Sequence, residues 1–141
     1  MFADFFGVPA ATTTSFARIA LHTGAPIIPG FLVPLPHGRY RMKFLPALEL
    51  VRTGDMNRDV VLATELFNRV LESIIREHPE SWLWGHKRWK NQPPGSPDLY
   101  ALSARELDAA LERLKQQRAQ AAARDGHPAL TDSSAARGAA P

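Results

Sequence analysis

The stretch Phe2-Ala3-Asp4-Phe5-Phe6-Gly7-Val8-Pro9 decides the class of fold predicted for this chain. Its first five residues are mostly aromatic or aliphatic, as is typical of a buried strand. We expect this strand to end in a turn at residues 7–9, because Gly7 gives the backbone conformational freedom and Pro9 blocks further strand pairing.

A helix and a second strand follow this turn. Residues 16–21 have the composition of a helix, with the hydroxyl side chains of residues 12–15 placed to cap its first turn and Gly24 placed to end it. Residues 25–33 are almost uniformly apolar, which predicts a strand covered on both faces of a parallel or mixed sheet. The order strand, helix, strand predicts a βαβ unit and therefore an α/β fold.

Two more elements are predicted downstream. Residues 39–44 alternate basic with apolar side chains, which indicates a half-exposed strand in a hairpin with residues 25–33. In residues 56–77 apolar side chains recur at helical spacing, and Asp55 or Asn57 is placed to cap this helix.

The domain organisation follows from changes in composition. Residues 1–97 are expected to form the C-terminal part of a larger α/β domain. Residues 98–123 predict an amphipathic helical extension, because Leu107 and Leu111 lie on one stripe of a segment rich in Ala, Glu, Arg and Gln. Residues 124–141 are rich in Ala, Gly, Pro and Ser, which predicts a disordered tail.

Composition excludes several classes of site. The chain has 17 Lys and Arg against 14 Asp and Glu, and the resulting net charge of +3 is too small to indicate nucleic-acid binding by itself. It has no cysteine, so disulfides, thiolate metal sites and a cysteine nucleophile are excluded. The longest apolar run, residues 25–36, is interrupted by Pro and Gly and is shorter than the roughly 20 residues that a spanning helix needs.

Residues 82–90, Trp-Leu-Trp-Gly-His-Lys-Arg-Trp-Lys, contain all three tryptophans of the chain. One interpretation is that the tryptophans close the core after the long helix and the cations form a solvated face. The other keeps Trp82 in the core and presents Trp84, His86, Arg88 and Lys90 to an anionic partner through cation–π contacts and phosphate pairing. Neither makes His86 a catalyst, since local spacing fixes no partner for it.

The hydroxyl-rich residues after the first turn are a second candidate region. Thr12 and Thr13 could face a ligand at the carboxyl end of a strand, where α/β sheets bind ligands, or serve simply as helix caps. Arg18 lies within an apolar helical pattern and is either an exposed residue or an anchor for an anionic group.

Four blocks taken together resemble the lipid A biosynthesis acyltransferase family, the late lauroyl and myristoyl transferases. They are Phe-Phe-Gly-Val-Pro-Ala-Ala-Thr at 5–12, Ala-Arg-Ile-Ala at 17–20, Thr-Gly-Ala-Pro-Ile-Ile-Pro at 23–29, and Pro-Glu-Ser-Trp-Leu-Trp-Gly-His-Lys-Arg-Trp-Lys at 79–90. The resemblance extends from about residue 2 to residue 94, and the order and spacing of the blocks make it specific.

This resemblance implies an enzyme with the α/β fold of glycerolipid acyltransferases at the cytoplasmic face of the inner membrane. It would transfer a fatty acyl group from acyl carrier protein or coenzyme A to a hydroxyl of a phosphorylated lipid A precursor, with no cofactor and no nucleic-acid partner. The substrate-binding residues it suggests are Phe6, Gly7, Thr12, Thr13, Arg18, Trp84, His86, Arg88 and Lys90.

The family's catalytic motif, a His separated by four residues from Asp or Glu, is expected upstream of the Phe-Phe-Gly block. The chain is therefore expected to be a fragment that is inactive alone, from a mis-started or split gene, with no catalytic residue or membrane anchor of its own. His127 and Asp132 match the spacing, but they lie in the predicted disordered tail with Pro128 between them, where no preorganised base can be held.

Two alternatives stay open. The chain could be a small basic and aromatic module that binds anionic membrane or nucleic acid without catalysis, using the cations of residues 39–43 and 84–90. It could also be an unstable piece that exposes sheet edges and apolar surface.

Overall fold

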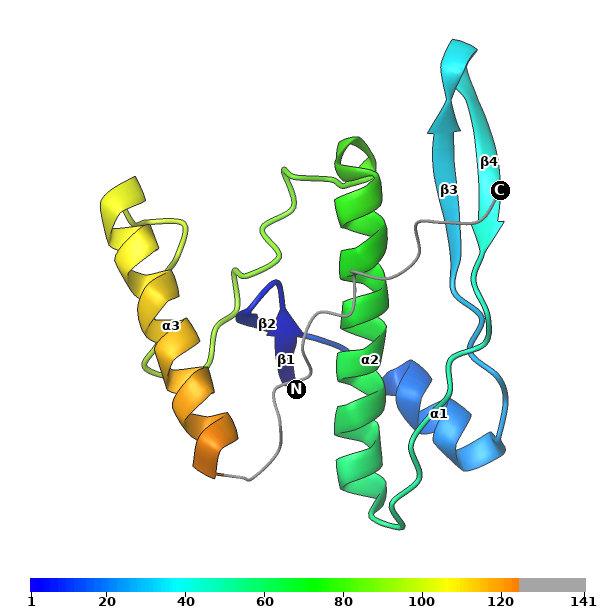
Figure 1. Cartoon of the computed structure of the whole chain (residues 1–141), viewed down its shortest axis with the longest axis horizontal. Coiled ribbons are helices and arrows are strands. Elements are labelled where there is room, and N and C mark those ends of the chain that lie inside the picture. The colour runs from blue at the N-terminus through cyan, green and yellow to red at the C-terminus, as the bar shows by residue number, and fades with distance from the viewer. Residues whose placement is uncertain (125–141) are drawn as a thin grey trace, which may run out of the picture. The chain divides into compact units, whose positions relative to one another are not determined.

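A computed structural model describes residues 1–124. It divides into two compact units, Met1–Ala101 and the residues from Leu102 onward. The elements, in order, are β1 (Phe2–Phe5), β2 (Val8–Ala11), α1 (Ser15–Thr23), β3 (Gly30–Leu35), a 3-10 turn (Pro36–Gly38), β4 (Arg39–Phe44), α2 (Met56–Glu77), a 3-10 turn (Pro79–Ser81) and α3 (Ala104–Arg124). The described residues are therefore of mixed helix and sheet composition, with two small sheets, the long helices α2 and α3 and the shorter helix α1 (Figure 1).

The first sheet is an antiparallel hairpin, so the predicted βαβ unit is wrong for the described residues. Strand β1 pairs with β2, and Phe5 stands opposite Val8 across a two-residue turn. Pro9 does not end the sheet as expected, because it lies opposite Asp4 in a strand with one free edge, where the missing N–H of Pro is tolerated.

The second sheet is the predicted hairpin of β3 and β4, paired antiparallel from Gly30 opposite Phe44 to Leu35 opposite Arg39. Its first strand begins at Gly30 rather than at residue 25, since Pro26 and Pro29 have no N–H to donate to a ladder. The expectation that this strand is covered on both faces is also wrong, because Leu32 is exposed.

Helix α2 is the element on which unit Met1–Ala101 is built, and its predicted span is confirmed. The Asp55 side chain caps it by accepting hydrogen bonds from the backbone N–H groups of Asn57 and Arg58. Its first half packs Val60 and Ala63 against α1, and its second half packs Ile75 against Phe5 of β1; the full clusters are Ala17, Leu21, Val60 and Ala63, and Phe5, Ala10 and Ile75.

The other two helices follow the sequence pattern closely. Helix α1 ends at Gly24, whose φ of 75° is the left-handed conformation that glycine adopts without strain. At the N-terminal end of α1, the Thr14 side chain makes no capping bond to the backbone. Thr13 Oγ1 accepts a weak hydrogen bond from the Ser15 N–H at 3.4 Å. A helix was predicted in residues 98–123, and α3 begins there six residues later, at Ala104. No helix within residues 1–124 is long and apolar enough to cross a bilayer.

The domain boundaries predicted at residues 97 and 123 stay a prediction. The match between His127 and Asp132, and the disorder predicted for the tail beyond Arg124, lie outside the described residues.

Asp59 makes the stability of α2 dependent on pH. Hydrogen bonds from the backbone N–H of Thr53 (2.8 Å) and from its hydroxyl (2.7 Å) lower the pKa of this buried carboxyl. A carboxyl with a lowered pKa stabilises the fold above its unfolded pKa of about 3.9, and this contribution disappears as the pH falls through the folded-state value.

We therefore expect Asp59→Asn to unfold at a lower urea concentration than the wild type at pH 7, and the difference to shrink below about pH 3.5. The midpoint of urea unfolding followed by circular dichroism measures this. Asp108→Asn, which changes an exposed carboxyl of α3, is the matched control. An equal loss of stability at both pH values would contradict the assignment.

Candidate functional site

Two polar side chains on the buried face of α2 hold the β1–β2 hairpin. The Asn68 amide donates to the carbonyl of Asp4 at 2.6 Å, and the Glu72 carboxylate accepts the N–H of Phe6 at 2.8 Å. Asn68 and Glu72 are both buried, so each needs a partner, and the hairpin backbone supplies it. The helix thereby positions the Phe6-Gly7 turn.

This turn contains two of the predicted substrate-binding residues. Phe6 has a φ of 53° and Gly7 a φ of 83°, as a two-residue turn of type I′ requires. A positive φ costs a bulky residue roughly 1–2 kcal/mol. The Arg76 guanidinium lies 4.9 Å from the centre of the Phe6 ring and donates to Glu72 at 3.1 Å, so the turn is held from both its backbone and its side chain.

Arg88 joins the tryptophan segment to the same hairpin. Its guanidinium donates to the Ala11 carbonyl at 2.7 Å and to the Thr12 hydroxyl at 2.8 Å, and it lies 4.9 Å from the centre of the Phe5 ring. Burial lowers the pKa of Arg88, although a guanidinium remains protonated at any physiological pH. Thr12 and Arg88, predicted separately as site residues, are thus in direct contact.

The tryptophans divide into two groups. Trp82 and Trp89 both pack against Phe5, with ring centres 5.8 and 5.7 Å from the centre of the Phe5 ring. The Trp89 indole also donates to the Phe5 carbonyl at 3.3 Å. Trp84 is 63% exposed, and its indole donates to the Pro79 carbonyl. Trp82 is thus partly buried against the core, as both interpretations of this segment expected, and Trp84 lies outside it. Arg88 bonds to the hairpin, and the presentation of Trp84, His86 and Lys90 to an anionic partner stays a prediction.

The remaining predicted residues are not part of this cluster. His86 and Lys90 are exposed on the tryptophan segment. Thr13 Oγ1 lies 3.1 Å from the Ser15 hydroxyl, and Arg18 donates to the Thr14 hydroxyl at 3.3 Å. The side-chain bond of Arg18 is local to the start of α1, so a substrate role for Arg18 stays a prediction, as do the roles of the others.

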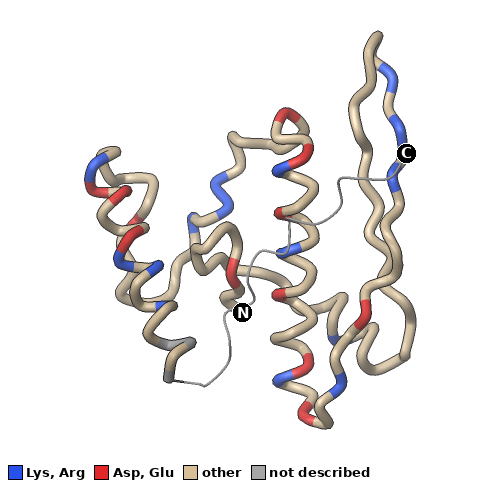
Figure 2. The backbone as a smooth tube through the Cα atoms, viewed as in Figure 1, with Lys and Arg blue, Asp and Glu red and all other residues tan. Residues whose placement is uncertain are grey.

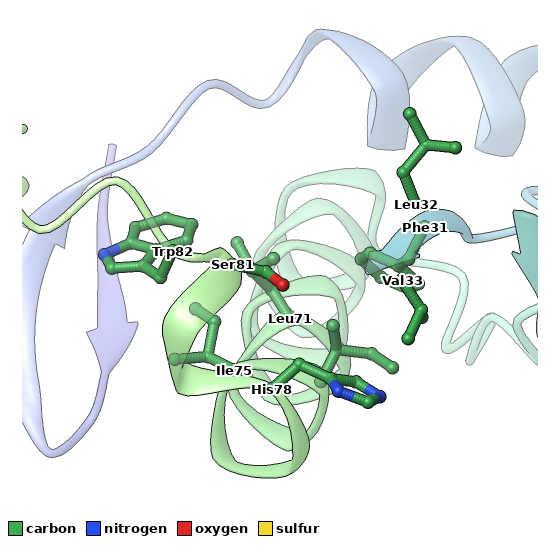
Figure 3. Close-up of a pocket in the computed structure, with 9 residues that line it drawn as sticks. Phe31, Leu32, Val33, Leu71, Ile75, His78, Ser81 and Trp82 are labelled. Carbon is green, nitrogen blue, oxygen red and sulfur yellow. The ribbon is translucent and has the colours of Figure 1, made fainter. Parts of the chain in front are cut away.

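An apolar pocket of about 190 Å³ lies between β3 and the C-terminal end of α2 (Figure 3). Its walls come from β3, α2 and the start of the tryptophan segment, and are made chiefly of Phe31, Val33, Leu71, Ile74, Ile75 and Trp82. His78 and Ser81 add polar atoms at its border. The pocket joins two regions that the sequence did not connect.

His78 is the pocket residue that the sequence analysis overlooked. Its Nδ1 lies 3.4 Å from a carboxylate oxygen of Glu80, and its Nε2 lies 3.6 Å from one of Glu77. The run Glu77-His78-Pro79-Glu80 carried the signal, a histidine between two acids at the end of a helix. In the described part of the chain, no group of three His, Cys, Asp or Glu side chains could hold a metal ion.

Arg88→Ala is expected to lower the free energy of unfolding by about 2 kcal/mol, because two hydrogen bonds to a charged group are lost and the Phe5 ring is uncovered. Arg88→Lys should recover only part of this, since an ammonium lacks the planar fork. Urea unfolding measures both. Lys90→Ala, at an exposed cation two residues away, should change stability by less than about 0.5 kcal/mol. An Arg88→Ala variant as stable as the wild type would contradict the role of Arg88 as a structural link.

Comparison with known proteins shows the family of this chain. A model of the bacterial lipid A biosynthesis acyltransferases matches residues 1–91. The chain is 31% identical over 102 residues to a lipid A biosynthesis lauroyltransferase of Escherichia coli, and 33% identical over 101 residues to a lipid A biosynthesis palmitoleoyltransferase of the same organism and to a lipid A biosynthesis acyltransferase of Shigella flexneri. These matches cover 71% and 70% of the chain but 32% and 31% of the relatives, so the chain spans about a third of their length. The chain belongs to the bacterial lipid A biosynthesis acyltransferase family.

Proposed function

We propose that this chain takes part in the transfer of a fatty acyl group to a hydroxyl of a phosphorylated lipid A precursor. Acyl carrier protein or coenzyme A is the proposed donor, and the cytoplasmic face of the inner membrane the proposed location. The observation that carries the proposal is the apolar pocket beside a basic and aromatic segment, in a chain of this family. An acylated substrate needs both environments, one for its alkyl chain and one for its phosphates.

The pocket is suited to part of an alkyl chain. Phe31 and Val33 on one side and Leu71 and Ile75 on the other offer hydrocarbon surface with few groups that need hydrogen bonds. Its volume of about 190 Å³ is below the range of roughly 300–1,000 Å³ that encloses a whole small-molecule ligand. A segment of an acyl chain, with the rest of the substrate outside, matches this size.

The tryptophan segment is the proposed phosphate side of the site. Trp84, His86 and Lys90 are exposed there, and ammonium and indole groups both suit a phosphorylated sugar. Arg88 already donates to Ala11 and Thr12, so its proposed contribution is to keep this segment on the hairpin rather than to be the main phosphate ligand.

We propose that residues 1–124 do not supply the general base. No histidine in this range is followed after four intervening residues by Asp or Glu, which is the pair that the family resemblance calls for. The carboxylates beside His78 lie at 3.4 and 3.6 Å, longer than the hydrogen bond that orients a catalytic imidazole.

Binding of an acyl donor tests the pocket. A brominated acyl-coenzyme A should quench tryptophan fluorescence in the wild type, because Trp82 lines the pocket. Trp82→Phe should lose most of this quenching, and Val33→Phe, which fills the pocket, should weaken binding by roughly tenfold. Val51→Phe, at an exposed position, is the control. Equal quenching in the wild type and in Trp82→Phe would refute the site.

An activity assay tests the missing base. Purified residues 1–141, supplied with lauroyl-acyl carrier protein and a tetraacylated lipid A precursor, should give no transfer above the rate without protein. Product formed at an enzymatic rate would overturn this part of the proposal. A His78→Ala variant would then show whether His78 is the base.

A further inference from the structure

The β3–β4 hairpin has an apolar face that nothing in unit Met1–Ala101 covers. Side chains alternate along a strand, so Tyr40, Met42 and Phe44 share one face of β4, and the register places Leu32 of β3 opposite Met42 on that face. These four side chains are between 51% and 69% exposed. Figure 3 shows the side chains of Leu32 and Val33 pointing to opposite sides of the strand, and both residues border the pocket.

The Phe44 ring of this apolar face packs over the neighbouring strand. Gly30 stands opposite Phe44, and a Cβ at Gly30 would lie only 3.1 Å from the Phe44 ring. The ring thus lies across the neighbouring strand in the space that glycine leaves free, an arrangement that fixes its direction. The Phe44 ring is consequently held on this face.

The charged side chains carried by β3 and β4 are all of one sign. From Phe5 to Leu48 the sequence has no Asp or Glu, and β4 carries Arg39, Arg41 and Lys43. Figure 2 shows these cations along β4. Lys43 pairs with Glu77 of α2 at 2.7 Å, whereas Arg39 and Arg41 are exposed. An anionic surface is the electrostatic complement of such a hairpin.

We propose that the β3–β4 hairpin lies on an anionic lipid bilayer, with the side chains of Leu32, Tyr40, Met42 and Phe44 at the headgroup and acyl boundary. This inference rests on the membrane location proposed above and assigns it to one element. The long side chains of Arg39 and Arg41 leave the opposite face of the strand and extend around its edge to the lipid phosphates. The hairpin would thereby hold the pocket close to the bilayer from which lipid substrates come.

A second copy of the chain is a poorer occupant of the same face. A twofold contact presents the same surface from both copies, so the cations of two β4 strands would border it. With no acidic side chain on either strand, these like charges would be left uncompensated. Lipid phosphates supply the missing negative charge.

The absence of cysteine allows a single label at any chosen position. Met42→Cys carrying an environment-sensitive fluorophore should shift to shorter wavelength when the full chain meets phosphatidylcholine vesicles that contain about one third phosphatidylglycerol. Ile19→Cys, labelled at an exposed position of α1, should not shift. Leu83→Cys reports on the tryptophan segment, the competing exposed apolar region.

The partition of variants onto vesicles then separates the contribution of the cations from that of the apolar side chains. Arg39→Gln and Arg41→Gln should each lower the partition coefficient by roughly fivefold. The triple variant Tyr40→Ser, Met42→Ser and Phe44→Ser should lower it by more than about tenfold. Ile19→Ser with Val51→Ser should change it by less than about twofold. Circular dichroism confirms that each variant is folded.

Three results would overturn the inference. The first is sedimentation with vesicles while only the Leu83 label shifts, which would leave the proposed membrane location standing but assign it to the tryptophan segment. The second is no sedimentation at all, which would remove the membrane location as well. The third is a shift of the Met42 label with protein concentration in the absence of lipid, which would assign the face to a second copy. Acyl-donor binding at Trp82 is measured independently of all three.

Discussion

The hydrogen bonds from α2 to the β1–β2 hairpin are the constraint on which the rest of the unit depends. Asn68 donates to the Asp4 carbonyl and Glu72 accepts from the Phe6 N–H, so backbone groups of the partly buried hairpin are paired by the helix. A two-stranded hairpin is marginal in isolation, so its shape here is imposed by the helix. Phe5 then becomes the centre on which Trp82, Trp89 and Arg88 assemble.

This arrangement explains how a short chain forms an organised surface with a small core. Polar side chains inside the interface fix positions, and aromatic side chains supply the buried area. Buried polar groups cost free energy unless they are paired, so their pairing selects one docking geometry among many that hydrophobic packing alone would allow. The pocket lies beside the end of α2, between the helix and β3.

Local patterns predicted the local elements well and the long-range contacts poorly. Helix α2 was predictable because its apolar period and the Asp55 cap agree, and α1 because Gly24 marks its end. The β1–β2 hairpin was missed because Pro9 normally argues against a strand, and whether a strand is at an edge depends on partners that the sequence does not name. The bond from Arg88 to Thr12 joins residues 76 positions apart, and no spacing rule connects them.

The two hairpins are attached with unequal strength, and this has a consequence for their dynamics. The β1–β2 hairpin is held by buried hydrogen bonds and by Phe5, whereas Lys43 of the β3–β4 hairpin is tied to α2 by a solvent-accessible ion pair with Glu77, which is individually weak and screened by salt. We therefore expect the opening of β3–β4 to require less free energy than global unfolding, so that its amide protons exchange with solvent through local opening. A surface bound to the β3–β4 hairpin would therefore restrict the local opening of this hairpin before it affected the packing of β1–β2 on α2.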